Sequence, residues 1–221
     1  MIKCISCVDF QDRAHCRSDL FESKESFLRT NYDFYGGNAY GVVSDFGCGG
    51  WGLVTCLGGR NWSDEWFCGQ ILADQKAILP KQLRKHSAFV GEKIFDEIVT
   101  VEEMSSAKQC IEEALKLSGQ PYSVDDVKRL FGLSDERFER NLDNVGIEIN
   151  RISVAINFAL GKDIFCYPWL NEHDVENISC HIINVLKAHE KIVLIPTSQE
   201  KAVKKLCNHL ICYSKGKIKY R

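Results

Sequence analysis

The 221-residue sequence lacks any long apolar run, and charge of one sign does not dominate it. No stretch reaches the roughly 18 apolar residues that a membrane-spanning helix needs, so we expect no such helix. The net charge is −2, which gives no indication of nucleic-acid binding. The first residues lack an apolar segment behind a basic start, and we therefore expect a cytoplasmic protein without a signal peptide.

The sequence also lacks internal repeats, low-complexity stretches and a recognisable linker. A chain of this length can bury a substantial core as one domain, or as a core with a subdomain. No Ser/His/Asp or Cys/His catalytic arrangement can be identified from the spacing of these residues.

Cysteine, by contrast, is abundant: the eleven cysteines are odd in number and scattered along the chain. Most of them fall in apolar patterns, which favours reduced thiols that pack as small hydrophobic side chains. The alternative is a metal site at Cys4 and Cys7 with His15 and Cys16. Because a second Cys-x-x-Cys pair is missing, the spacing supports this site only weakly, and we expect no metal.

Apolar periodicity and turn residues predict strands that alternate with helices, which indicates an α/β fold with a mostly parallel sheet. We expect strands at 2–10, 27–35, 40–43, 67–73, 87–90, 164–167, 192–195 and 210–213, the last in a closing hairpin. One helix is expected after the glycine-rich turn, ending at Gly58, and two more begin at capping boxes, Thr100–Glu103 and Ser123–Asp126. Two further helices are expected at about 134–142 and at 149–159. The last two should begin at Asp174, as the N-cap of a helix that runs to Leu186, and at Thr197.

Residues 36–60 form the most informative stretch, in which an apolar run leads into a glycine-rich turn and then a helix. Small residues in such a turn let backbone N–H groups face an anion, and the helix N-terminus adds its dipole. A working phosphate-binding loop also needs a lysine for the phosphates and a Ser or Thr for Mg²⁺. Gly50 and Trp51 occupy these two positions, so the loop lacks both groups.

From about residue 34 to the C-terminus, the order of elements resembles the nucleotide-binding domain of ATP-binding cassette (ABC) transporters. Residues 40–53 look like that family's first strand and Walker A loop, 88–92 fall where it has its Q-loop, and 94–103 resemble the segment that follows. Residues 151–155 look like the start of the helix after the signature motif, and residues 167–174 resemble the end of Walker B and the D-loop. Residues 195–199 fall where the family has its switch region, and residues 210–218 resemble its closing hairpin.

The resemblance implies a P-loop NTPase-like (ABC ATPase) core with a mostly parallel sheet, an N-terminal antiparallel β part and an α-helical subdomain. The whole chain, 1–221, would form one such domain. Its core and β part would occupy 1–100 and 147–221, and the α-helical subdomain would occupy 101–146.

The motif residues depart from the family at almost every functional position. The degenerate phosphate loop consists of Ser44, Asp45, Phe46, Gly47, Cys48, Gly49, Gly50, Trp51 and Gly52. The other positions are Glu92 in the Q-loop, Asn144, Val145 and Gly146 in the signature, Tyr167 and Pro168 in Walker B, Asp174 in the D-loop, and Ser198 at the switch histidine. Phosphoryl transfer depends on a lysine, a metal and a water-orienting group, so their joint replacement predicts that hydrolysis is lost.

The resemblance leaves three functions open. The first is a non-hydrolysing subunit that works with an intact ABC ATPase and a membrane permease, peripheral to the inner face of the membrane through that partner. The second is a soluble regulatory or binding protein that reuses the fold, and the third is an unusual active ATPase. ATP bound weakly without Mg²⁺ is the only cofactor expected, because the loop amides could still hold phosphate; alternatively, Trp51 fills the vacant phosphate space with apolar contacts.

Overall fold

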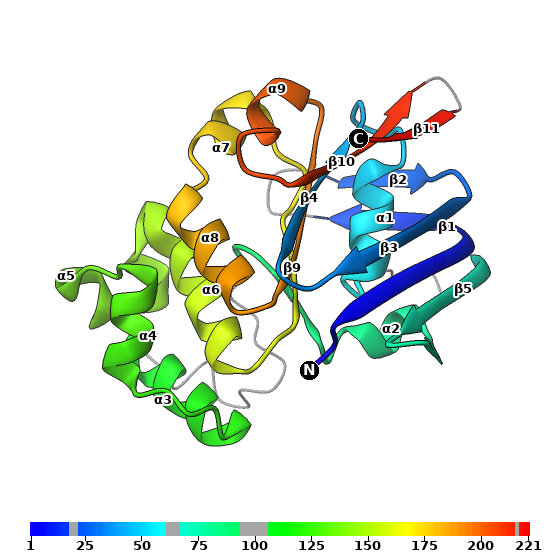
Figure 1. Ribbon diagram of the computed structural model, residues 1–221. Helices are drawn as coiled ribbons and strands as arrows, with labels where there is room; N and C mark the ends of the chain where they lie inside the picture. Colours follow the sequence, from blue (N-terminus) through cyan, green and yellow to red (C-terminus); the bar gives the residue numbers. More distant parts are fainter. Residues whose placement is uncertain (18–21, 61–66, 93–105, 215–216) are drawn as a thin grey trace. The chain divides into compact units, whose positions relative to one another are not determined.

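The computed structural model describes residues 1–17, 22–60, 67–92, 106–214 and 217–221 (Figure 1). The chain forms two compact units, one made of residues 1–87 with 163–221 and the other of residues 88–162. The α-helical subdomain predicted at 101–146 falls within the numbers of the second unit, and its limits stay a prediction.

The first sheet of the first unit is antiparallel, with the order β2-β1-β5-β6 and with β3 also paired to β1. Its strands are β1 (Cys4–Arg17), β2 (Glu22–Ser26), β3 (Thr30–Tyr35), β5 (Phe67–Ala73) and β6 (Lys76–Ile78). The strands expected at 2–10, 27–35 and 67–73 are thus confirmed, although β1 continues to Arg17. The sequence analysis missed β2, which pairs with the second half of β1.

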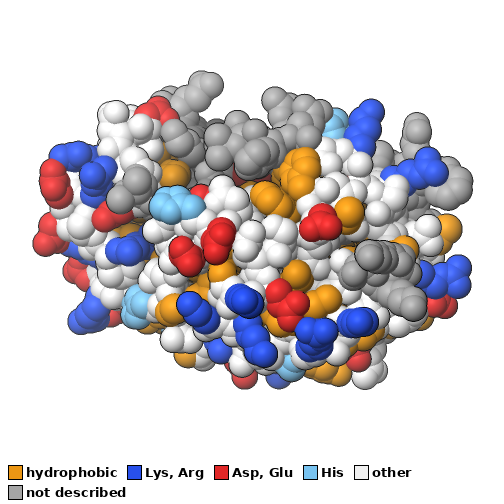
Figure 2. All heavy atoms as spheres, turned by 90° about the horizontal axis from the view of Figure 1, so that it is seen from above, with side chains coloured by type: hydrophobic (Ala, Val, Ile, Leu, Met, Phe, Trp, Pro, Cys, Tyr) orange, Lys and Arg blue, Asp and Glu red, His pale blue; other side chains and the backbone are white. Residues whose placement is uncertain are grey.

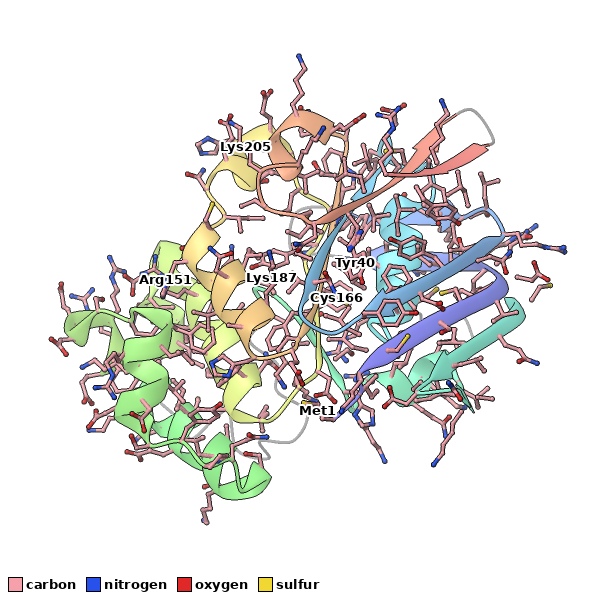
Figure 3. All side chains as sticks on the ribbon, in the orientation of Figure 1. Met1, Tyr40, Arg151, Cys166, Lys187 and Lys205 are labelled. Carbon is pink, nitrogen blue, oxygen red and sulfur yellow. The ribbon has the colours of Figure 1, made fainter. Side chains whose placement is uncertain are left out.

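The second sheet has the order β11-β10-β4-β9-β8-β7. Its strands are β4 (Asn38–Val43), β7 (Ser87–Phe89), β8 (Ile164–Cys166), β9 (Ile192–Thr197), β10 (His209–Ser214) and β11 (Lys217–Tyr220). The run β10-β4-β9-β8 is parallel, and every residue of β9 is buried, as expected for a central parallel strand. Tyr40 of β4 and Cys166 of β8, both labelled in Figure 3, belong to this buried sheet.

Helix α1 (Gly50–Leu57) follows β4 directly, and all of its residues are buried. It begins after Gly49 in a left-handed conformation and ends at Gly58, as the sequence predicts. The other helices of this unit are α2 (Pro80–Leu83), α7 (Glu172–Glu176), α8 (Cys180–Ala188) and α9 (Glu200–Val203).

Two predicted helix caps are wrong. Asp174 does not begin a helix that runs to Leu186; Asn171 caps α7 instead, and its side-chain oxygen accepts from the Asp174 amide at 3.0 Å. A separate helix, α8, begins only at Cys180. Thr197 is the last residue of β9, and its hydroxyl donates to the Leu170 carbonyl at 2.6 Å, so Gln199 precedes α9 as its N-cap.

The second unit is mainly helical. It contains α3 (Ala107–Ser118), α4 (Val124–Phe131), α5 (Asp135–Phe138) and α6 (Ile149–Ala159), with 3₁₀ turns η1 (Leu142–Asn144) and η2 (Gly146–Glu148). The capping box at Ser123 is confirmed, because its hydroxyl accepts from the Asp126 amide at 3.1 Å. Ser106 caps α3, whereas the box predicted at Thr100–Glu103 lies outside the described residues. Phe131 of α4 packs edge-on against Phe158 of α6, with 5.2 Å between the ring centroids.

Among the helices of the described residues, none combines the length and the apolar character of a membrane span. On the face shown in Figure 2, basic and acidic side chains are interspersed, in keeping with the net charge of −2.

Candidate functional site

The carboxyl ends of three parallel strands bring several of the predicted site residues to one edge of the second sheet. Ser44 follows β4, Tyr167 follows β8 and Ser198 follows β9. The backbone joins these ends: the Ser44 amide donates to the Thr197 carbonyl at 2.9 Å, and the Tyr167 amide donates to the Leu194 carbonyl at 2.9 Å. In open α/β sheets this edge is where ligands bind.

The phosphate loop, residues 44–52, turns sharply through two glycines with positive φ. The φ angles are 81° at Gly47 and 99° at Gly49, a region in which residues with a Cβ are strained. The Gly49 carbonyl then accepts from the Leu53 amide at 3.0 Å, which starts the hydrogen bonding of α1. As a result, the backbone N–H groups of Gly47, Gly49 and Gly52 converge; we call these three groups the amide cradle.

The amide cradle is occupied by a side chain of the protein itself, Glu25 of β2. One carboxylate oxygen of Glu25 accepts from the Gly47 amide at 2.9 Å. The other accepts from the Gly49 amide at 3.1 Å and from the Gly52 amide at 2.8 Å. Only 1% of Glu25 is exposed, and Gly49 and Gly52 are also buried, whereas Gly47 is an exposed residue.

Two opposing influences act on the ionisation of Glu25. Burial raises the pKa of its carboxyl group, and this is the larger effect. Hydrogen bonds from the backbone amides of Gly52, Gly47, Gly49 and Trp51 act in the opposite direction, because they stabilise the charged form. The position at the start of α1 also favours a negative charge.

The segment that follows Glu25 lies directly against the loop backbone. A Cβ atom built on Gly49 would lie 2.7 Å from both the Phe27 Cα and the Ser26 carbonyl oxygen. A Cβ on Gly52 would lie 3.1 Å from the Glu25 Cβ and 3.3 Å from a Phe27 ring carbon. These glycines therefore permit the close approach of the protein's own chain.

Trp51 is fully buried in α1 and belongs to an aromatic cluster with Phe46 and Trp169. The Phe46 ring centroid lies 5.9 Å from that of Trp51 and 5.2 Å from that of Trp169. No described residue accepts a hydrogen bond from the Trp51 indole N–H. The Glu25 carboxylate faces the loop amides, and whether Trp51 also fills the phosphate space stays a prediction.

Gly50, which the resemblance predicts to stand at the lysine position, is crowded by the Ser44 side chain. A Cβ atom on Gly50 would lie 2.4 Å from the Ser44 Oγ and 3.0 Å from the Ser44 Cβ. The Ser44 hydroxyl is itself buried, and no described residue hydrogen-bonds to it. A lysine at this position would therefore require the Ser44 side chain to move.

This crowding leads to a prediction for a double-mutant cycle. Gly50→Ala should lower the free energy of unfolding by about 1–3 kcal/mol through overpacking, and Ser44→Gly in the same chain should recover most of this loss. Urea denaturation of the two single variants and the double variant measures the coupling. If Gly50→Ala instead raises stability, as helix propensity alone would predict, the crowding at Ser44 is negligible.

The other predicted residues of the first unit offer no carboxylate at the end of β8. Tyr167 is 4% exposed, and burial raises the pKa of its phenol. Pro168 follows it without an ionisable group. Asp174 is a half-buried residue of α7, and the Ser198 hydroxyl accepts from the Gln199 side-chain amide at 3.3 Å.

The predicted residues of the second unit take part in its local structure. The Glu92 carbonyl accepts from the Ser153 hydroxyl at 3.2 Å. Asn144 ends η1, the Val145 carbonyl accepts from the Arg137 guanidinium at 2.9 Å, and Gly146 has a φ of 57°.

The sequence analysis missed Glu25. It lies in a polar stretch, and its acidic neighbour Glu22 belongs to the same strand, so nothing in the local pattern distinguishes it from a solvated acid. Only the pairing of β2 with β1 brings it to the loop.

The cysteines that the sequence pattern assigned to apolar positions are mostly buried thiols. The buried ones are Cys7, Cys16, Cys56, Cys110, Cys166 and Cys212. Within the described part of the chain, no group of three His, Cys, Asp or Glu side chains is arranged to hold a metal ion.

No protein-family model and no curated protein sequence matches this chain. Among solved structures, it is similar to cbiO1 from Clostridium perfringens, described as part of the ABC transporter complex cbiONQ. The TM-score is 0.64 with 13% sequence identity, over 96% of this chain and 87% of that chain. The likeness shows a mixed α/β fold like that of this part of an ABC transporter complex.

Proposed function

We propose that this protein is a non-hydrolysing ABC-type subunit that works beside an intact ATPase. The observation that supports this proposal is that the fold resembles that of an ABC-type subunit, whereas the residues at the sheet edge lack the groups needed for hydrolysis. Gly50 and Trp51 replace the lysine and hydroxyl expected at the start of α1, while Tyr167 and Pro168 follow β8 where two acids are expected. Hydrogen bonds to charged groups contribute about 1.5–3 kcal/mol each, so the lost lysine alone weakens triphosphate binding.

Hydrolysis requires more than a bound nucleotide. The attacking water must be oriented, and the charge that develops on the transferred group must be stabilised by cations. A proline cannot polarise water, and a tyrosine phenol is protonated near neutral pH; burial raises the pKa of Tyr167 further. Neither residue supplies the missing functions.

The proposed partners follow from the family resemblance and from the similar structure, which is part of a transporter complex. An ABC-type subunit pairs with a second such domain and with a permease, and this protein would reach the inner face of the membrane through them. The competing proposal is a soluble regulatory protein that reuses the fold.

Purification of the tagged full chain from its native cells tests the choice. We expect an ATPase with an intact lysine motif and a permease to co-purify from the membrane fraction. Recovery of the tagged chain from the soluble fraction, with neither partner, would favour the regulatory protein.

An ATPase assay of the isolated chain tests the loss of hydrolysis. We expect no Mg²⁺-dependent turnover above the background of a mock purification. Turnover that persists in Glu92→Gln and Asp174→Asn variants would contradict the proposal and would indicate an ATPase that uses other residues.

A further inference from the structure

We infer that Glu25 is a built-in anion that occupies the phosphate loop and makes its folded conformation independent of nucleotide. This inference rests on the proposed function in one respect, namely that the loop descends from a phosphate-binding loop. It adds that the conformation of this loop is set by Glu25 and not by a nucleotide.

The geometry of the amide cradle fits a single carboxylate. Its three N–H groups lie 2.8 to 3.1 Å from the two oxygens of one carboxylate, within the range of good hydrogen bonds. Bonds to an ionised acceptor are stronger than neutral ones, and successive amides of this kind are suited to binding phosphate oxygens. A carboxylate supplies the same acceptor chemistry, so Glu25 satisfies donors that would otherwise face a phosphate.

The Glu25 side chain is also held firmly in place by its surroundings. Glu25 is 1% exposed, and Phe27, two residues later, is 2% exposed. The Phe27 ring lies 5.4 Å from that of Phe10, and its amide donates to the Asp12 carbonyl at 3.3 Å. Both contacts attach the end of β2 to β1.

The segment that follows Glu25 limits access to the loop. Phe27 and Ser26 come within 2.7 Å of the position of a Cβ on Gly49, so this segment lies in close contact with the loop backbone at Gly49. β2 is the end strand of its sheet and pairs only with β1 among the strand pairings of the described residues. In the wild type, an anion could bind the amide cradle only after the Glu25 carboxylate had left it.

The consequence is a loop that stays folded as if occupied, whether or not ATP is present. Without Glu25, the buried N–H groups of Gly49 and Gly52 would lose their acceptor, and unpaired buried donors are costly. The loop of this protein would then not alternate between an empty and a filled form during the cycle of a partner ATPase.

Chemical rescue of Glu25→Ala tests the inference. Thermal unfolding is followed in sodium chloride, sodium acetate and sodium phosphate at equal ionic strength, for the wild type and for Glu25→Ala. In chloride we expect Glu25→Ala to unfold about 5–10 °C below the wild type. Acetate or phosphate should return several degrees of this loss, because a small oxyanion fits the vacated amide cradle and stabilises the folded state by mass action.

Two further variants serve as controls. Glu25→Gln fills the same volume, but its amide group places donors against donors, so it should lose stability without any rescue by anions. Glu139→Ala removes an acid with an exposed side chain that pairs with Lys108 at 3.0 Å, and it should respond to the three salts as the wild type does.

Three outcomes would overturn the inference. They are a Glu25→Ala variant that gains no more from acetate or phosphate than the wild type does, a Glu25→Gln variant rescued as well as Glu25→Ala, and a wild type stabilised by ATP, or by phosphate more than Glu139→Ala is. If Glu25→Ala does not fold in chloride, it is refolded in each salt; recovery only in acetate or phosphate supports the inference, and failure in every salt contradicts it. Partner co-purification is unaffected by these outcomes, so the inference and the proposed function fail separately.

Discussion

Replacement of Trp51 by alanine is expected to lower the free energy of unfolding by about 3–5 kcal/mol. Trp51 has no exposed surface, and every other residue of α1 is buried as well. The cavity left by the indole would lie inside a helix that cannot shift easily, so the surroundings can collapse only in part. Urea denaturation followed by circular dichroism measures the change.

Two companion variants show whether packing is the cause. Phe46 belongs to the same aromatic cluster but is 42% exposed, so Phe46→Ala should cost clearly less than Trp51→Ala. Trp51→Ser restores the hydroxyl of an ordinary phosphate loop, yet it should be as unstable as Trp51→Ala and should gain no Mg²⁺-dependent ATP binding. A loss below about 1 kcal/mol for Trp51→Ala would show that the site collapses fully, contrary to the close packing of protein interiors.

Asp163→Ala is expected to have an effect of similar size, about 3–5 kcal/mol. Asp163 is 2% exposed, and its carboxylate accepts from the Ile2 amide at 2.9 Å. It also lies 3.4 Å from the ammonium of Lys191, itself 7% exposed, and 3.5 Å from the His86 imidazole. Its removal would take the carboxylate partner from a buried ammonium and from a buried amide.

Removal of both charges separates the two causes of this loss. Replacing a buried ion pair with apolar groups is often neutral or stabilising, so Asp163→Leu with Lys191→Met should be more stable than Asp163→Ala alone. As a surface control, Glu200→Ala breaks the pair with Arg221, 2.8 Å long, and should cost no more than about 1 kcal/mol. Equal losses of unfolding free energy for Asp163→Ala and Glu200→Ala would contradict the view that Asp163 stabilises the fold as a buried, paired carboxylate.

Local sequence signals predicted much of the fold because they arise from short-range physics. The Ser123 capping box, the buried run of β9 and the glycines around α1 each act within a few residues, and the structure contains all three. The wrong caps at Asp174 and Thr197 show where such signals compete. Asn171 and Gln199 precede the observed helices, and the Thr197 hydroxyl is engaged by Leu170 from another segment.

The amino-acid sequence is enough to tell which chemistry the phosphate loop lacks, since Gly50 and Trp51 cannot act as a lysine and a hydroxyl in any fold. Tertiary structure alone decided what the loop holds instead. Glu25 and Gly47 are 22 residues apart, and no local pattern relates an acid in a polar strand to a glycine turn. They meet because β2 pairs with the far half of β1, which brings the buried carboxylate to the amides of Gly47, Gly49 and Gly52.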